Sequence, residues 1–77
     1  MNKLKLKEYN EYQIVYLYQP EGKGELGEIV YSFADKEAKV LKLAGDSSSY
    51  YYNKALSKVE ECARGKALPV DFVQAWV

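Results

Sequence analysis

The sequence predicts an α+β fold in which a three-stranded antiparallel meander carries one helix packed on the sheet and a short C-terminal strand, in the order β-β-β-α-β. Three observations lead to this prediction. Strand-like segments alternate with turn residues over positions 12–44, an apolar stripe at helical spacing follows at positions 52–63, and a second alternation closes the chain. The 77 residues provide for one small domain.

The meander is expected over residues 12–18, 26–33 and 38–44. The first of these segments, YQIVYLY, is rich in β-branched and aromatic residues and places Ile14, Tyr16 and Tyr18 on one face. Turn residues at 19–24 and 34–37 end the strands, and loops this short join antiparallel neighbours. Residues 1–7 alternate leucine with lysine, which indicates either a loose segment or an edge strand.

A helix is expected after Asp46 and the serines at 47–49, whose side-chain oxygens cap free N–H groups. Gly65 is placed to end this helix. The tail at 70–77 is ambiguous between a strand and a last helical turn, and its alternation favours a strand parallel to the third one. The apolar stripe of the helix consists of Tyr52, Ala55, Leu56, Val59, Cys62 and Ala63.

The composition excludes several classes of protein. With 48% hydrophobic and 14% aromatic residues, the chain is too apolar to be disordered. The 11 basic and 11 acidic side chains cancel, so no net charge attracts nucleic acid or an anionic membrane. One cysteine forms no internal disulfide, and no apolar run is long enough for a signal peptide or a bilayer span. We therefore expect a cytoplasmic protein that is not bound to membranes.

Catalytic groups are scarce, and we expect no enzyme, no metal and no cofactor. The chain has no histidine, and Cys62 lies on the stripe predicted to be buried, where thiols are inert. Glu25 and Glu28 are typical of solvated hairpin acids, and no zinc or EF-hand spacing occurs. The G-x-G-x-x-G string at 22–27 precedes strand-like sequence instead of the helix that binds a pyrophosphate, so it predicts a hairpin loop.

The chain contains eight tyrosines and only two phenylalanines, an unusual ratio that needs an explanation. Three consecutive tyrosines at 50–52 start the helix, and because successive residues are about 100° apart, at least one should be exposed. Tyrosine either replaces phenylalanine in a thin domain or marks an interface, where it is enriched. The leading hypothesis is a non-enzymatic interaction module that binds a protein partner or itself. Its predicted partner-binding residues are Tyr16, Tyr18, Tyr50, Tyr51 and Trp76.

The alternative hypothesis is a single-stranded nucleic-acid-binding protein. Bases would stack on the aromatic side chains of the sheet, and lysines would contact the phosphates. The zero net charge and the single arginine weigh against this class. The lysines expected to converge on one sheet edge are Lys3, Lys5, Lys7, Lys39 and Lys42.

A resemblance covers most of the chain from about residue 12 onward. The segment EGKGELGEIVY at 21–31, the helix segment YNKAL at 52–56 and the late Pro69 with the ending AWV are similar to small uncharacterised proteins of Gram-positive phages and conjugative elements. The resemblance implies an accessory protein of a mobile element that acts by binding, and it implies no catalytic residue.

Overall fold

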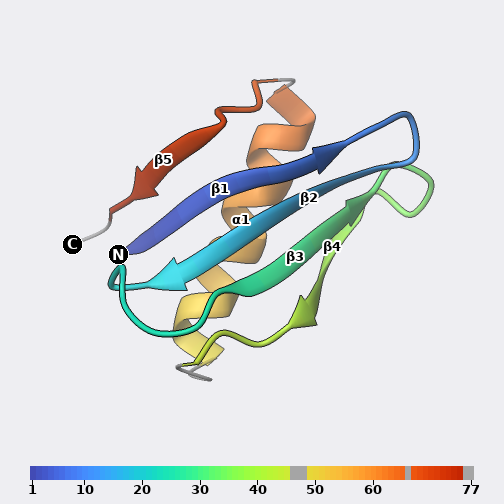
Figure 1. Ribbon diagram of the computed structural model, residues 1–77. Helices are drawn as coiled ribbons and strands as arrows, with labels where there is room; N and C mark the ends of the chain where they lie inside the picture. Colours follow the sequence, from blue (N-terminus) through green and yellow to red (C-terminus); the bar gives the residue numbers. More distant parts are fainter. Residues whose placement is uncertain (46–48, 66, 76–77) are drawn as a thin grey trace.

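The computed structural model describes residues 1–45, 49–65 and 67–75, and it forms a five-stranded antiparallel sheet with one helix across one face (Figure 1). The predicted α+β class is confirmed, but the meander has four strands instead of three. The elements in chain order are β1 (Asn2–Tyr9), β2 (Gln13–Pro20), β3 (Gly27–Ser32), β4 (Glu37–Lys42), α1 (Ser49–Gly65) and β5 (Asp71–Gln74).

The first segment of the chain is neither loose nor an edge strand. It forms most of β1, which lies between β2 and β5 in the sheet order β4-β3-β2-β1-β5. Leu4 is fully buried on the face that α1 covers, whereas Lys3 and Lys5 are exposed. Alternation in a strand places successive side chains on opposite faces, so the leucine–lysine pattern is that of an interior strand with one face covered.

The C-terminal strand forms as predicted, but it joins the other edge of the sheet. β5 runs in the same direction as β4, yet it pairs antiparallel with β1, so that Lys3 faces Val73 and Lys5 faces Asp71. The length of α1 permits this placement. Its 17 residues extend about 25 Å, whereas the four strand spacings between β4 and β5 add up to about 19 Å. The helix therefore carries the chain across the whole sheet (Figure 1).

The core lies between α1 and the inner face of the sheet. Ala55, Val59 and Cys62 are buried, as the predicted helical stripe requires. Against them pack the inward side chains of the strands, which alternate with residues on the uncovered face. The buried strand residues in this cluster include Leu4, Ile14, Tyr16, Tyr18, Ile29, Tyr31 and Ala38.

The glycine-rich string at 22–27 lies in a hairpin loop up to residue 26, as predicted, and Gly27 begins β3. Glu21 and Gly22 have φ values of 52° and 68°, and the N–H of Lys23 donates to the carbonyl of Pro20 at 3.0 Å. Positive φ at both central residues is typical of the turn type that matches the twist of two paired strands. β3 follows this loop directly. The described residues therefore offer no helix N-terminus after these glycines.

Gly27 provides the space for the ring of Tyr18, its partner across the β2–β3 ladder. A Cβ atom on Gly27 would lie 2.2 Å from Cε1 of Tyr18 and 2.7 Å from the backbone nitrogen of Ala44. The hydroxyl of Tyr18 accepts a hydrogen bond from that same N–H of Ala44 at 3.1 Å. The ring thus crosses over β3 and holds the segment that leads from β4 to α1.

We predict that Gly27→Ala lowers the free energy of unfolding by about 1 to 3 kcal/mol, because the added methyl group has to displace a fully buried ring. Urea unfolding measures the change. The control is Gly65→Ala at the end of α1, where a Cβ atom meets nothing within 4 Å and φ is not positive. Equal stability of the two variants would contradict the close packing at Gly27.

Candidate functional site

Tyr16 and Tyr18 were predicted to bind a partner, and this prediction is wrong. Both side chains are 0% exposed, because the strand face that they share with Ile14 is the face under α1. The sequence left open which face of the sheet the helix covers. Since neither ring reaches the surface, neither is available to a protein partner or to a stacked base.

Tyr16 instead fixes the chain after the helix. Its hydroxyl donates to the carbonyl of Pro69 at 2.7 Å, and its ring meets that of Phe72 edge-on at 5.9 Å between centroids. Burial, and after it the nearby thiol of Cys62, raises the pKa of Tyr16 to about 12. The neutral phenol is therefore a structural donor that positions β5.

The tyrosines at the start of α1 have different surroundings. Tyr50 is 52% exposed and Tyr51 is half-buried, and their rings meet edge-on at 5.8 Å between centroids. The ammonium group of Lys54 lies 5.6 Å from the centroid of Tyr50, within reach of a cation–π contact. Of the predicted binding residues, Tyr50 is the one with a largely exposed side chain among those described, and Trp76 lies outside the described residues.

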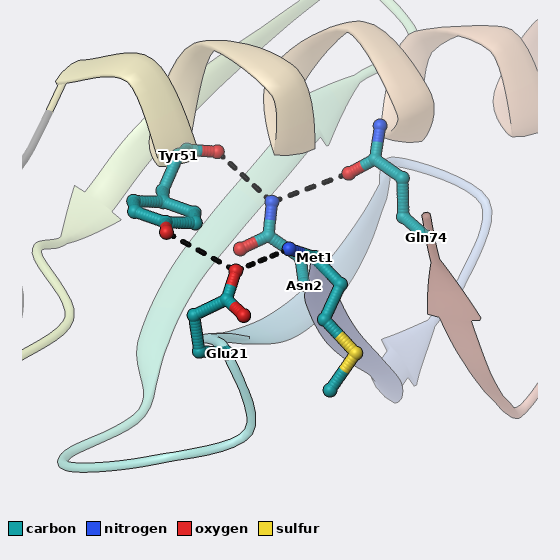
Figure 2. A network of polar contacts seen from close by, with 5 residues as sticks. All are labelled: Met1, Asn2, Glu21, Tyr51 and Gln74. Carbon is teal, nitrogen blue, oxygen red and sulfur yellow. Dashed lines mark hydrogen bonds and ion pairs between the residues drawn. The ribbon is translucent and has the colours of Figure 1, made fainter. Parts of the chain in front are cut away.

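A buried amide ladder joins the beginning of β1 to α1 and β5 (Figure 2). The side-chain amide of Asn2 donates to the carbonyl of Tyr51 at 3.0 Å and to Oε1 of Gln74 at 3.2 Å. The amide of Gln74 in turn donates to the carbonyl of Lys54 at 2.9 Å. Asn2 is fully buried, and these bonds satisfy its amide nitrogen, whereas its Oδ1 atom has no hydrogen-bond partner among the described residues.

Tyr51 and the turn after β2 complete this network. The hydroxyl of Tyr51 donates to Oε2 of Glu21 at 3.1 Å, and the ammonium group of Met1 donates to the same oxygen (Figure 2). The ammonium group, followed by the hydroxyl, lowers the pKa of Glu21. Tyr51 is thus occupied by contacts that hold the helix start to the sheet, which is a structural role.

Another exposed aromatic surface lies at the opposite end of the sheet. Tyr9 is 63% exposed, and its ring centroid lies 6.4 Å from that of Phe33. The ring of Phe33 also meets that of Tyr31 edge-on at 5.6 Å. Next to these rings opens a cavity of about 590 Å³, which we call the aromatic cleft. Its lining residues are Leu6, Tyr9, Ile14, Phe33, Ala63 and Leu68.

A β-bulge places Tyr9 in the aromatic cleft. The register between β1 and β2 shifts at Lys7, so that Leu6 faces Tyr16, Glu8 faces Val15 and Tyr9 faces Ile14. The extra residue moves Tyr9, in place of Glu8, to the side of the sheet that α1 covers. Tyr9 lay outside the strands predicted from the sequence, and a bulge leaves no mark in an alternating pattern, so the cleft was missed.

The turn between β1 and β2 holds this end of the sheet in shape. The side-chain oxygen of Asn10 accepts hydrogen bonds from the N–H groups of Tyr12 at 2.8 Å and Gln13 at 3.0 Å. The N–H of Asn10 donates to the carbonyl of Gln13 at 3.0 Å. Asparagine favours such turns because its side chain replaces a backbone acceptor.

The uncovered face of the sheet, which we call the lysine face, gathers the five lysines named in the alternative hypothesis. They do not converge on one edge as predicted: three of them belong to the interior strand β1, and Lys39 and Lys42 belong to the edge strand β4. Lys7 also pairs with Glu28 of β3 at 2.7 Å, across β2. Aliphatic residues of β2 and β3 lie between the lysines of β1 and β4. The five residues are Lys3, Lys5, Lys7, Lys39 and Lys42.

The remaining candidates for chemistry are separated from one another. Cys62 is buried, and burial raises the pKa of its thiol, which disfavours the reactive thiolate. Glu28 is paired with Lys7. Within residues 1–45, 49–65 and 67–75, no three histidine, cysteine or acidic side chains gather where they could hold a metal ion. In the same ranges no helix has the length and apolarity to cross a membrane.

Comparisons with family models, with curated proteins and with solved structures find no match to this chain. The resemblance to proteins of phages and conjugative elements therefore stays a prediction.

We predict that Tyr16→Phe lowers the free energy of unfolding at pH 7 by about 1 kcal/mol, because the hydrogen bond from the hydroxyl of Tyr16 to the carbonyl of Pro69 is lost. The raised pKa gives a second effect. The raised pKa of Tyr16 contributes fully to the free energy of unfolding below the ordinary tyrosine pKa of 10, and this contribution is lost as the pH rises through about 12.

Urea unfolding at neutral and alkaline pH measures both effects. Over this alkaline range the stability of Tyr16→Phe should fall less steeply than that of the unchanged protein. The control is Tyr12→Phe, since the side chain of Tyr12 is 72% exposed. If the stabilities of Tyr16→Phe and of the unchanged protein fell in parallel as the pH rises, the raised pKa would not belong to Tyr16.

Proposed function

We propose that this protein is a non-enzymatic interaction module that binds a protein partner through the aromatic cleft. The observation that carries the proposal is the largely exposed ring of Tyr9 beside an apolar cavity of about 590 Å³. A cavity between about 300 and 1,000 Å³ is of the size that accepts a bound group. Tyrosine at such a position combines a large apolar area with few rotatable bonds, as in the centres of protein interfaces.

The walls of the aromatic cleft support this role because they are already in place. Its floor is Ile14, which is buried in the core, and Phe33 is held by its edge-on contact with Tyr31. Ala63 belongs to α1, and Leu68 follows that helix. Walls that need little ordering on association reduce the entropy cost of binding.

The occupant that suits these walls is an apolar side chain of the partner. The lining consists of three aliphatic residues, one alanine and two aromatic rings, so the gain on binding comes mainly from apolar area removed from water. The hydroxyl of Tyr9 provides one polar group that can fix the orientation of the bound segment. Binding of a second copy of the chain is the competing occupant and is tested in the same experiment.

We predict that Tyr9→Ala weakens partner binding at least about tenfold, the loss typical of a central tyrosine, while the thermal unfolding midpoint changes little. A displayed peptide library is first selected on the unchanged protein. Selected peptides are then titrated against each variant, and amide chemical shifts map the bound peptide. The expected peptides share an aromatic or aliphatic anchor and shift the amides of residues that line the cleft.

Two other tyrosines provide controls of the same residue type. Tyr12→Ala removes an exposed ring from the same hairpin that does not line the cleft, and it should leave binding unchanged. Tyr50→Ala tests the helix-start surface predicted from the sequence. If Tyr50→Ala weakens binding and Tyr9→Ala does not, the aromatic cleft is not the binding site. Sedimentation of the protein alone would reveal self-association in its place.

A further inference from the structure

A second, separate hollow lies on the lysine face. It measures about 290 Å³ and lies where β5, β1 and β2 meet the loop before β3. Its lining combines two lysines with two leucines that are not part of the buried core. The residues on this face that line it are Lys3, Lys5, Leu17, Gln19, Leu26 and Asp71.

Strand register sets the spacing of the two lysines. Lys3 faces Gln19 and Lys5 faces Leu17 in the β1–β2 ladder. Residues two apart on a strand share a face and lie about 7 Å from each other. The two ammonium groups therefore stand along one side of the hollow, next to the aliphatic surface of Leu17 and Leu26.

The charge around the hollow is positive although the chain as a whole is neutral. Lys42 lies on the same cross-strand row, opposite Glu28, and Glu28 is already paired with Lys7. Asp71, which faces Lys5 on β5, is the acid that lines the hollow itself.

Two acids of the described residues lie at the far end of the lysine face. There Glu37 faces Ser32, and the carboxylate of Glu8 accepts hydrogen bonds from the side chains of Asn10 and Gln13. The lining of the hollow thus carries two lysines against one acid.

We propose that this hollow binds an acidic peptide segment of a protein partner. An aliphatic side chain of the segment enters between Leu17 and Leu26, and carboxylates on either side of it pair with Lys3 and Lys5. Charge complementarity and the mixed lining support this occupant. Each ammonium–carboxylate pair adds little at an exposed site, so the apolar contact and the two pairs are needed together.

The lining favours a peptide over a nucleic acid. Among the described residues no aromatic side chain lines the hollow, and the tyrosines of β2 face the core, so this part of the chain offers bases no ring on which to stack here. Asp71 repels a phosphate backbone as much as it repels a carboxylate, but a peptide gains the compensating contact with the leucines. This site is independent of the aromatic cleft, which lies on the other side of the sheet.

The first test titrates the full chain against a labelled peptide of about a dozen residues with one leucine between glutamates. Fluorescence anisotropy gives the affinity at low and at physiological salt. Changing Lys3 and Lys5 together to glutamine should weaken binding about tenfold. The matched control changes Lys58 and Arg64 of α1 to glutamine, which removes the same charge from the other side of the molecule and should leave the affinity unchanged.

A second set of variants separates the apolar contact from simple attraction of charge. Leu26→Ala should weaken binding of the leucine peptide several-fold and leave binding of a peptide with alanine in place of that leucine unchanged. The control is Leu41→Ala, because Leu41 is also exposed, and it should change the binding of neither peptide. Asp71→Asn should tighten binding a few-fold. Tyr9→Ala should leave this affinity unchanged, so the outcome is independent of that for the aromatic cleft.

Several results would overturn the proposal. Equal affinity for the leucine and alanine peptides would mean that the hollow takes no side chain. Tighter binding of an oligothymidylate of similar length, with a steep loss as salt rises, would assign the lysine face to nucleic acid. Absence of binding at low salt would show that the hollow is not a binding site. The same conclusion would follow if the double variant at Lys3 and Lys5 and the control double variant on α1 lost equal affinity.

Discussion

The packing of α1 across the inner face of the sheet is the constraint on which the rest of the structure depends. β4 and β5 lie at opposite edges, so the helix between them crosses all the strands and covers the middle of β2. The hydroxyl of Tyr18 accepts from the N–H of Ala44 before the helix, and that of Tyr16 donates to the carbonyl of Pro69 after it. Phenylalanine would fill the same space, but it would leave both connections unbonded.

The two proposed binding surfaces follow from how much of the sheet one helix covers. A helix about 10 Å wide leaves the end near the β1–β2 turn uncovered, and there Tyr9 and Phe33 border the aromatic cleft. No helix of the described residues covers the opposite face, so its lysines remain in solvent around the aliphatic residues of β2 and β3. The two proposed surfaces lie on opposite sides of the sheet, so the partners proposed for them would not compete for space.

Local patterns were sufficient for much of the fold but for little of the candidate site. The spacing of Ala55, Val59 and Cys62 predicted the buried side of α1, and the alternation in β2 grouped Tyr16 with Tyr18 correctly. That same grouping misled the site prediction, because the pattern shows that two side chains share a face but not whether the helix covers that face. Tyr9 was missed for another reason: the bulge at Lys7 shifts the alternation only once β1 is paired with β2.

By itself the sequence determined the α+β class, the helix, most of the strands and which side chains share a face, because these depend on repeats of two or 3.6 residues within one segment. The tertiary structure alone decided that β1 is an interior strand, that β5 joins β1, that the tyrosines of β2 lie under α1 and that the lysines share the open face. Each of these depends on pairing between segments distant in the chain, and a local pattern contains no information about which segments will become neighbours.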